Sequence, residues 1–542
     1  GNGYVTEFGY DANGTATPMI EAKGTPLERA TTWLYECPAW PSYWTTRSVP
    51  STTSGLRTTT RTWGAGETTL SVTENGSSSG GSRAYTTVET YGTKHRLQSV
   101  NGPRTDVNDT TTLAYYADAP VSDNAGRLNT STDAAGLATT YASYDVYGTA
   151  RNVTDANGVL TSLTTDERGR VTGRSIAPVA GDPDQTTYST TWHFDSRDRL
   201  DLVTLANGNK TAYGYEEGTN RLTATIREDS AGHQLERLLL TLNDIGGKTQ
   251  EEAQECTASP QTTDCTASWA TRRSEKFTYD TKNRLTQVVH PVPLPEDSSK
   301  IIYAYDPNGQ LRTVQDERHA SANTTYTYDA LGRLSVVAQT LTGAPGNQIT
   351  TQYGYDVQDN LTSVTDPNGS TTTYAYDDFR RMTSQASPVS GATTHTYDEA
   401  GNLVDSTDAN GALTHRTYDP LNRLYTVSST RTGYPTELLT NTWGGSGSTA
   451  RYSRGRLLSA DVKVDGVSKV TTDYGYERRG LLASESQTVL GTSSSVGYQY
   501  DGNGNRRSVT YPSGRIVSFG FDFADRPTSA TSASPARTYV SA

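Results

Sequence analysis

Hydrophobic and polar positions recur with a fixed period of 21 residues between Tyr353 and Leu424. Each period holds a run of aromatic and β-branched residues, an Asp, a short polar segment and a second run that starts with Leu or Met. The Asp residues of four successive periods are Asp356, Asp377, Asp398 and Asp419. A constant period of this length indicates a repeat architecture, so the unit must be interpreted before any single motif.

Each unit predicts two short antiparallel strands and two turns. Residues 371–376 (Thr-Thr-Thr-Tyr-Ala-Tyr) are β-branched and aromatic, which suits a half-buried strand, and Tyr374 and Tyr376 point to one face. The next residue, Asp377, can bond to backbone N–H groups and end the strand in a turn. A second turn, such as Asp-Pro-Asn-Gly at 366–369, reverses the chain again. We therefore predict an all-β fold, a long antiparallel sheet built from successive hairpins.

One regularity of the second run departs from simple alternation, because its apolar residues lie three positions apart instead of two. A β-bulge would put both residues of such a pair on one face and would bend the sheet. Repeated once per unit, the bend predicts a spiralling sheet. The pairs are Leu311 and Val314, Leu361 and Val364, and Leu424 and Val427.

The repeated motif resembles the YD repeat, or RHS repeat, of bacterial proteins, which is related to the shell of teneurins and to the Tc-toxin cocoon. The resemblance covers most of the chain and is weakest between about residues 15 and 110. It implies a hollow shell or an open barrel-like segment, in which the motif residues have a structural role in the repeat turn. These residues are Tyr328, Asp329, Gly332, Arg333, Tyr355, Asp356, Tyr376, Asp377, Tyr397, Asp398, Gly401, Tyr418, Asp419 and Arg423.

The clarity of the repeat divides the chain into five regions. Residues 1–14 form one repeat, 15–110 a degenerate Trp- and Thr-rich β region, 111–430 the main array, 431–527 looser repeats, and 528–542 a Ser/Thr/Ala-rich tail that is a frayed strand or a linker. Insertions lie near 256–265 and 290–299. The Pro-rich segment that begins at His290 is expected to leave the sheet as a loop, because proline lacks a ladder donor. Residues 234–242 fit a helix or a buried strand, and the surrounding repeats favour the strand.

Composition indicates a thin sheet instead of an oily core. Hydrophobic residues make up 33% of the 542 residues, and 34 Tyr stand against 7 Phe. Tyrosine rings pack as hydrophobes but need a hydrogen-bond partner when buried. The net charge of −12 argues against nucleic acid as a partner. The sequence also lacks an apolar run long enough to span a membrane directly.

Three cysteines leave one candidate pair. Cys256 and Cys265 bracket a polar insertion and are a possible disulfide in an exported protein. Cys37 lies among Trp33, Trp40 and Trp44 and has no evident mate. The Cys spacing does not match a metal-binding pattern, and no cofactor is expected.

Catalytic residues do not emerge from the sequence. The seven His residues fall at different strand positions and form no HxH or HExxH pattern. Paired carboxylates cannot be told from turn-capping Asp residues. Calcium binding by the Asp-x-Asn-Gly turns is conceivable, but the EF-hand pattern is not met. An Arg beside each turn is interpreted as the partner of the turn Asp, with a periodic ligand-binding ladder as the alternative. The sequence thus favours a protein that is not an enzyme.

The resemblance implies a non-catalytic β-shell segment of an exported protein, secreted or at the bacterial cell surface. Such a shell would enclose or present a C-terminal polypeptide toxin in bacterial competition. Two alternatives stay open: a surface adhesin or carbohydrate-binding scaffold, and a carbohydrate-active enzyme such as a polysaccharide lyase or hydrolase. Unpaired sheet edges invite pairing, so the expected partners are neighbouring repeats, a cleaved segment of the same precursor or another copy, and possible further ligands are glycans.

Overall fold

The computed structural model describes residues 5–11, 15–35, 45–52, 55–78, 81–119, 122–257, 265, 269–292 and 300–541. The predictions made for Cys37, for the turn at 12–14 and for most of the insertions at 256–265 and 290–299 lie outside the described residues.

The described residues form one antiparallel sheet of 43 strands, in which each strand pairs with its neighbours in sequence. The sheet is open, since β1 (Glu7–Tyr10) pairs with β2 (Ala16–Glu21) and β43 (Ala536–Ser541) pairs with β42 (Pro527–Ala533). Helical structure in the described ranges is limited to the 3₁₀ segments η1 (Ala65–Glu67), η2 (Thr93–His95) and η4 (Pro345–Asn347). The predicted all-β fold is confirmed.

The remaining strands follow in chain order. The first group is β3 (Arg29–Leu34), β4 (Thr46–Pro50), β5 (Leu56–Trp63), β6 (Thr69–Ser78), β7 (Gly81–Tyr91), β8 (Leu97–Asn101), β9 (Thr111–Tyr115), β10 (Leu128–Thr132), β11 (Ala138–Tyr144), β12 (Ala150–Thr154), β13 (Leu160–Thr165), β14 (Val171–Ile176), β15 (Tyr188–Phe194), β16 (Leu200–Thr204), β17 (Lys210–Tyr215), β18 (Leu222–Glu228) and β19 (Gln234–Leu242). The second group is β20 (Lys248–Cys256), β21 (Trp269–Tyr279), β22 (Leu285–Val292), β23 (Lys300–Tyr305), β24 (Leu311–Gln315), β25 (Thr324–Tyr328) and β26 (Leu334–Thr340). The third group is β27 (Gln348–Tyr355), β28 (Leu361–Thr365), β29 (Thr371–Tyr376), β30 (Met382–Ser387), β31 (Gly391–Tyr397), β32 (Leu403–Thr407), β33 (Leu413–Tyr418), β34 (Leu424–Thr430), β35 (Glu437–Trp443), β36 (Leu457–Val464), β37 (Val467–Tyr476), β38 (Leu482–Val489), β39 (Thr492–Tyr500), β40 (Arg506–Thr510) and β41 (Ile516–Phe521).

A β-bulge recurs in the return strand of the repeat. In the β23–β24 pair, Tyr305 lies opposite Leu311, whereas Ala304 lies opposite Thr313, so one extra residue is accommodated between them. The same shift occurs where β27 pairs with β28 and where β33 pairs with β34. The bulge predicted from the Leu and Val spacing is therefore confirmed, and it accounts for the bend of each hairpin.

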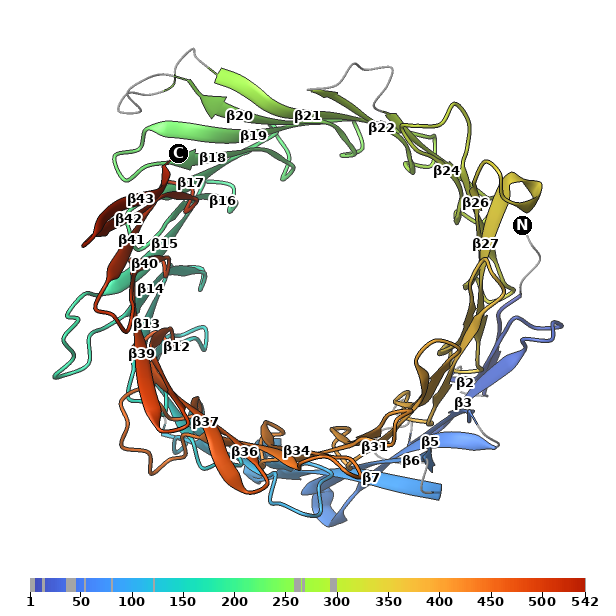
Figure 1. Ribbon diagram of the computed structural model, residues 1–542, viewed down its shortest axis with the longest axis horizontal. Helices are drawn as coiled ribbons and strands as arrows, with labels where there is room; N and C mark the ends of the chain where they lie inside the picture. Colours follow the sequence, from blue (N-terminus) through green and yellow to red (C-terminus); the bar gives the residue numbers. More distant parts are fainter. Residues whose placement is uncertain are drawn as a thin grey trace.

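The bent sheet winds into a spiral. The ribbon runs around a ring that no described segment crosses, and the strands from β27 onward lie beside the early strands (Figure 1). Hydrogen bonds tie these layers together, from Ser77 to Asp378, from Asn157 to Arg454 and from Arg227 to Ala524. One winding takes 297 to 301 residues at these positions. We call β1–β26 the first winding and β27–β43 the second winding.

The sheet is a single layer with little interior. A compact monomer of 58.5 kDa would expose about 19,000 Å² of surface, whereas this chain exposes 29,502 Å². Buried apolar side chains are few and scattered along the chain, with examples at Leu70, Val288 and Val509. The surface area and the ring outline together describe a hollow shell, and the described residues contain no helix long and apolar enough to cross a membrane.

Three segments resolve or correct the sequence interpretation. Residues 234–242 form the strand β19, as expected. The segment that begins at His290 is not wholly a loop, because β22 continues to Val292. The β21–β22 register shifts between Val289 and Val292, so the backbone at position 291 does not have to donate a regular hydrogen bond to β21. Pro291, which has no N–H group, is therefore tolerated there. The C-terminal tail is not a linker, because residues 527–541 form the paired strands β42 and β43.

Candidate functional site

Each repeat turn is closed by its Asp. In the turn after β25, Asp329 Oδ1 accepts the backbone N–H groups of Leu331 and Arg333, both at 2.9 Å. The backbone N–H of Gly332 donates to the carbonyl of Asp329 at 3.0 Å. Gly332 has a φ of 80°, a conformation that costs glycine little. The carboxylate therefore satisfies the donors that the tight turn would leave free.

The Arg of the turn connects one repeat to the next. Arg333 Nε donates to Asp329 Oδ2 at 2.7 Å, and its Nη1 donates to the carbonyl of Asp356 at 2.8 Å. The guanidinium also lies over the ring of Tyr355, 4.8 Å from the centroid. One cation thus holds its own turn, the backbone of the next turn and an aromatic ring.

The other motif residues make the same kinds of contact. Asp377 pairs with Arg381 and Asp419 pairs with Arg423, whereas Asp356 and Asp398 each accept an Asn side chain at 2.8 Å. Gly401 has a φ of 85° in its turn. Four of the motif Tyr hydroxyls named above donate to carbonyls of the preceding repeat: Tyr328 to Leu311, Tyr355 to Leu334, Tyr397 to Met382 and Tyr418 to Leu403.

The phenols of the motif are protonated at neutral pH. Burial raises the pKa of Tyr328, Tyr355, Tyr376, Tyr397 and Tyr418 above the ordinary value of 10.0, so their O–H groups stay intact into the alkaline range. The motif residues thus contact one another within the turn and connect to the neighbouring repeats. Their geometry serves the packing of one repeat on the next.

A second set of contacts, which the sequence did not reveal, joins the two windings. We call the turns after odd-numbered strands the repeat-turn edge and the turns after even-numbered strands the return-turn edge. The repeat-turn edge of the second winding packs against the return-turn edge of the first winding, and we call this contact the seam. Residues of the first winding between 29 and 227 bond across it to residues between 357 and 524.

Asp378 is a buried anion in the seam. Its carboxylate accepts the backbone N–H of Ser77 at 2.6 Å and of Thr52 at 2.7 Å. The hydroxyls of Ser51 and Thr52 donate at 2.9 Å each, and the Gln358 amide donates at 3.3 Å. Burial alone would raise the pKa of Asp378, but these hydrogen bonds outweigh it and lower the pKa below its usual value. The carboxylate thus links two hairpins of the first winding to the second.

Arg478 is the cationic counterpart further along the seam, with 2% of the residue exposed. Its Nη1 donates to the carbonyl of Asp184 at 2.6 Å, and its Nη2 donates to the carbonyl of Thr186. The side chains of Asp182 and Asp184 lie within 3.7 and 3.3 Å of the guanidinium. The ring of Tyr188 lies 4.8 Å below it. The loop between β14 and β15 therefore holds a fully enclosed cation from the second winding.

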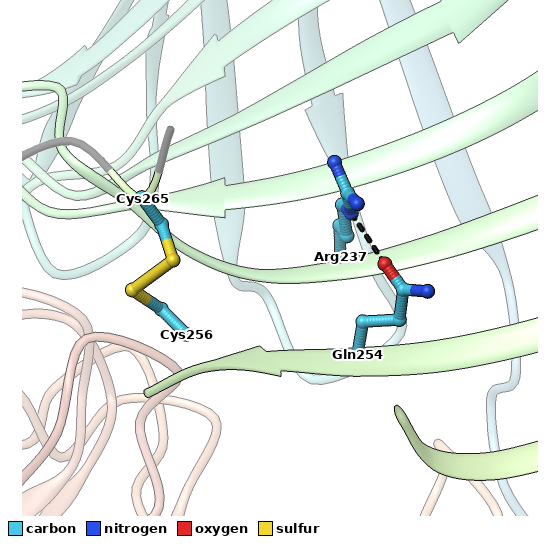
Figure 2. Close-up of a disulfide and its surroundings, with 4 residues drawn as sticks. All are labelled: Arg237, Gln254, Cys256 and Cys265. Atoms are coloured by element: carbon cyan, nitrogen blue, oxygen red, sulfur yellow. Dashed lines mark hydrogen bonds between the residues drawn. A yellow bond between two sulfur atoms is a disulfide. The ribbon is translucent and has the colours of Figure 1, made fainter. Parts of the chain in front are cut away.

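The disulfide closes the insertion between β20 and β21. Cys256, at the end of β20, is bonded to Cys265, and their Cα atoms are 5.7 Å apart (Figure 2). On the neighbouring strand, Arg237 Nε donates to Gln254 Oε1 at 2.7 Å. The bridge ties the end of β20 to Cys265.

Among the described residues, no group of three or more His, Cys, Asp or Glu side chains could hold a metal ion. The His residues are dispersed along the sheet. For example, His233 contacts Asp229, His319 contacts Asp316 and His415 contacts Asp405.

Known proteins resemble the chain in its repeat and in its fold. Five segments match the RHS Repeat family profile: residues 305–344, 345–371, 355–393, 397–435 and 494–536. No curated protein shows a significant match. A crystal structure described as TcdB2-TccC3-TEV is 12% identical, with a TM-score of 0.63, over 98% of this chain and 36% of that chain.

Two further structures give the same result. The Tc holotoxin pore of Photorhabdus luminescens is 12% identical, with a TM-score of 0.55, over 98% of this chain and 39% of that chain. TcdB2-TccC3 without its hypervariable C-terminal region is 11% identical, with a TM-score of 0.52, over 96% and 37%. The chain thus spans 36 to 39% of the length of these chains, and the likeness establishes a shared fold.

Proposed function

We propose, from the five segments that match the RHS Repeat profile and from the shared fold, that the sheet of this chain is the wall of a container for a polypeptide. The observation that carries the proposal is the spiral with its seam. A single-layer sheet winds past a full circuit, and Asp378 and Arg478 bond one winding to the other. A wall of this kind acts by steric exclusion. It needs no catalytic residue, only continuity of the sheet and of the seam.

The contents that we propose are a C-terminal toxin polypeptide used in competition between bacteria. Support comes from a structural neighbour that is described as having a hypervariable C-terminal region. The Cys256–Cys265 disulfide supports an exported location, secreted or at the cell surface, because disulfides persist in oxidising compartments.

Further windings of RHS sheet are the partners that we propose. The repeat-turn edge of the first winding exposes Val146 (75%) and Ile245 (66%), and the return-turn edge of the second exposes Val389 (94%) and Leu490 (73%). Within the seam, the same two kinds of edge are complementary. We infer that these outer edges bind sheet from the same precursor or from another copy, which fits a chain spanning 36% of a neighbour's length.

The test is protease protection in the natural gene product. We expect a C-terminal polypeptide to resist protease in the intact protein and to become sensitive when Asp378→Ala and Arg478→Ala are combined to open the seam. The matched control is Asp366→Ala, a turn residue that lies away from the seam contacts, for which protection should persist. Equal cleavage of that polypeptide in the intact protein and in the seam variant would contradict enclosure.

A further inference from the structure

A polar pocket of about 440 Å³ lies at the start of the seam. It is formed by strands β2 to β5 of the first winding and by the turns that follow β27 and β29 of the second. The blue strands β2, β3 and β5 lie next to the second winding in this region (Figure 1). The pocket thus exists only where the two windings meet.

The register places the strand residues of the pocket on one face of the sheet. Met19 pairs with Thr31, Glu21 with Arg29, and Val49 with Arg57. Residues two apart on a strand share a face, so Arg47 lies on the same side as Val49. Arg380 comes from the repeat turn of the second winding. Four arginines therefore line one pocket, Arg29, Arg47, Arg57 and Arg380.

The two carboxylates of the pocket are already neutralised. Arg29 bonds to Glu21 at 2.9 Å and to Asp359 at 2.7 Å, and Arg333 reaches Asp359 from outside the pocket at 2.9 Å. Among the described residues, no side chain or backbone group makes a hydrogen bond or ion pair with the guanidinium of Arg47 or Arg380. The remaining charge of the pocket is positive. It is carried by arginine guanidinium groups, which are planar and have several N–H donors, so they suit an oxyanion.

Two buried polar atoms of the lining also lack a partner within the described part of the chain. One is the donor Nε of Arg57, whose Nη2 makes a single bond to Glu74 at 3.2 Å. The other is the acceptor Oε1 of Gln358, a residue that is 4% exposed. Its amide nitrogen is used by the Pro50 carbonyl and by Asp378. Buried polar atoms are normally paired, so an unpaired donor and an unpaired acceptor in one lining point to a ligand with both functions.

We propose that this pocket binds a phosphate group, either as free hydrogen phosphate or in a phosphorylated sugar. The oxyanion lies among Arg47, Arg57 and Arg380, and a hydroxyl of the ligand donates to Gln358 Oε1. Sulfate satisfies the arginines but carries no hydroxyl, so it binds less well. Because the lining comes from both windings, the bound ligand also ties the seam together.

Isothermal titration calorimetry on the purified protein in phosphate-free buffer tests the site with sodium phosphate, glucose 6-phosphate, sodium sulfate and glucose. We expect heat from phosphate or glucose 6-phosphate, with the tighter of the two identifying the source, weaker binding of sulfate and none of glucose. The double variant Arg47→Gln/Arg380→Gln should weaken binding by about tenfold or more, as expected for lost charge-assisted hydrogen bonds.

The matched control is Arg312→Gln/Arg507→Gln, which removes two exposed arginines that do not line the pocket. It should bind like the parent protein. Absence of binding by both phosphate compounds, or equal weakening by the two double variants, would overturn the site. Sulfate binding as tight as phosphate would overturn the role of Gln358. Thermal unfolding with and without ligand provides a second readout, because ligand should stabilise the parent but not the Arg47/Arg380 variant.

Discussion

At the scale of single residues, the carboxylate of the turn Asp makes two kinds of hydrogen bond in the repeat. Oδ1 of the turn Asp caps backbone N–H groups, and Oδ2 holds the Arg or Asn that reaches the next repeat, as in Asp329 with Arg333. The two kinds of hydrogen bond can be separated, because return turns such as the one at Asp366 use only the first. Asp366 Oδ1 accepts N–H groups from Asn368 and Ser370, both at 2.9 Å.

This division predicts unequal costs for the same substitution. Asp366→Ala should lower the free energy of unfolding by about 1 kcal/mol, the worth of local turn bonds. Asp377→Ala should cost about 3 kcal/mol, because it also strands Arg381 in a pair whose side chains are 12% and 1% exposed. Denaturant unfolding of both variants measures the difference, and equal costs would show that the Asp377–Arg381 pair adds nothing.

The buried carboxylate of Asp378 should make the stability of the seam sensitive to acid. Its folded-state pKa lies below the ordinary value of 3.8, so the stabilisation is present above that value and is lost as the pH falls through the folded-state pKa. Thermal unfolding followed between about pH 6 and pH 2 should show this loss in the parent protein. Asp378→Asn should be less stable near neutral pH, with a flatter acid dependence. The same acid slope in both proteins would exclude Asp378 as its source.

At the scale of elements, hairpins are local and the seam is not. Each hairpin pairs only with its neighbours, so the loss of one contact within it stays local. Arg478 is different, since it joins the β37–β38 turn to residues 292 and 294 positions away. Seam residues should therefore affect two distant hairpins at once.

Arg478→Ala should loosen both sides of the seam. Its removal leaves Asp184 without its cation and Asp182 with only Arg451, whose guanidinium lies 3.9 Å away, and should cost about 3 kcal/mol locally, as for other buried ion pairs. Hydrogen exchange is the suitable measurement, and it should speed up in the β14–β15 loop and in the β37–β38 turn together. Arg312→Ala, an exposed change in β24, serves as the control. Faster exchange in the β37–β38 turn alone would mean that the two windings do not support each other there.

The disulfide should act within one hairpin. Cys256 and Cys265 are nine residues apart, and closing a loop of that size is worth about 3 kcal/mol in the chain-entropy treatment. Cys256→Ser with Cys265→Ser should increase exchange in β20 and β21 and leave the distant β29–β30 hairpin unchanged. Chemical reduction of the parent protein should reproduce the effect, and protection of β20 and β21 that survives both treatments would assign no stabilising role to the bridge.

Local elements could be predicted from the sequence because their causes are local. The spacing of Leu311 and Val314 indicated the bulge, and the alternation around Tyr374 and Tyr376 indicated the strand. Pro291 was misassigned to a loop because the register shift that accommodates it depends on the partner strand β21. The tail was left undecided between strand and linker since its Ser, Thr and Ala residues carry little pattern.

The seam could not be predicted from the sequence, and the reason is distance. Asp378 and Arg478 each follow an acidic repeat residue, Asp377 and Glu477, at a position that is solvent-exposed in other repeats such as Val146. Only the winding brings Ser77 to Asp378 across 301 residues. The pocket beside the seam was missed for the same reason, because Arg47 and Arg380 lie far apart in the chain.

At the scale of the whole molecule, the shell should be visible in solution. A compact chain of 542 residues would have a radius of gyration of about 24 Å. The described residues form a single-layer ring. We therefore expect small-angle X-ray scattering to give a clearly larger radius of gyration and a distribution of interatomic distances shifted to long distances. A value close to that of a solid globule would contradict the hollow shell.

The seam also fixes the circumference of the shell, that is, the number of hairpins in one winding. Hairpin pairing is indifferent to the number of hairpins in a winding, but Asp378 must arrive opposite Ser51 and Arg478 opposite Asp184. Duplication of a single 21-residue unit in the strands between these partners would leave every hairpin intact. It would nevertheless shift every later seam residue away from its partner in the other winding. Loops at the two outer edges, away from the seam, are therefore free to vary, whereas any change in the number of repeats per winding requires compensating changes in both windings.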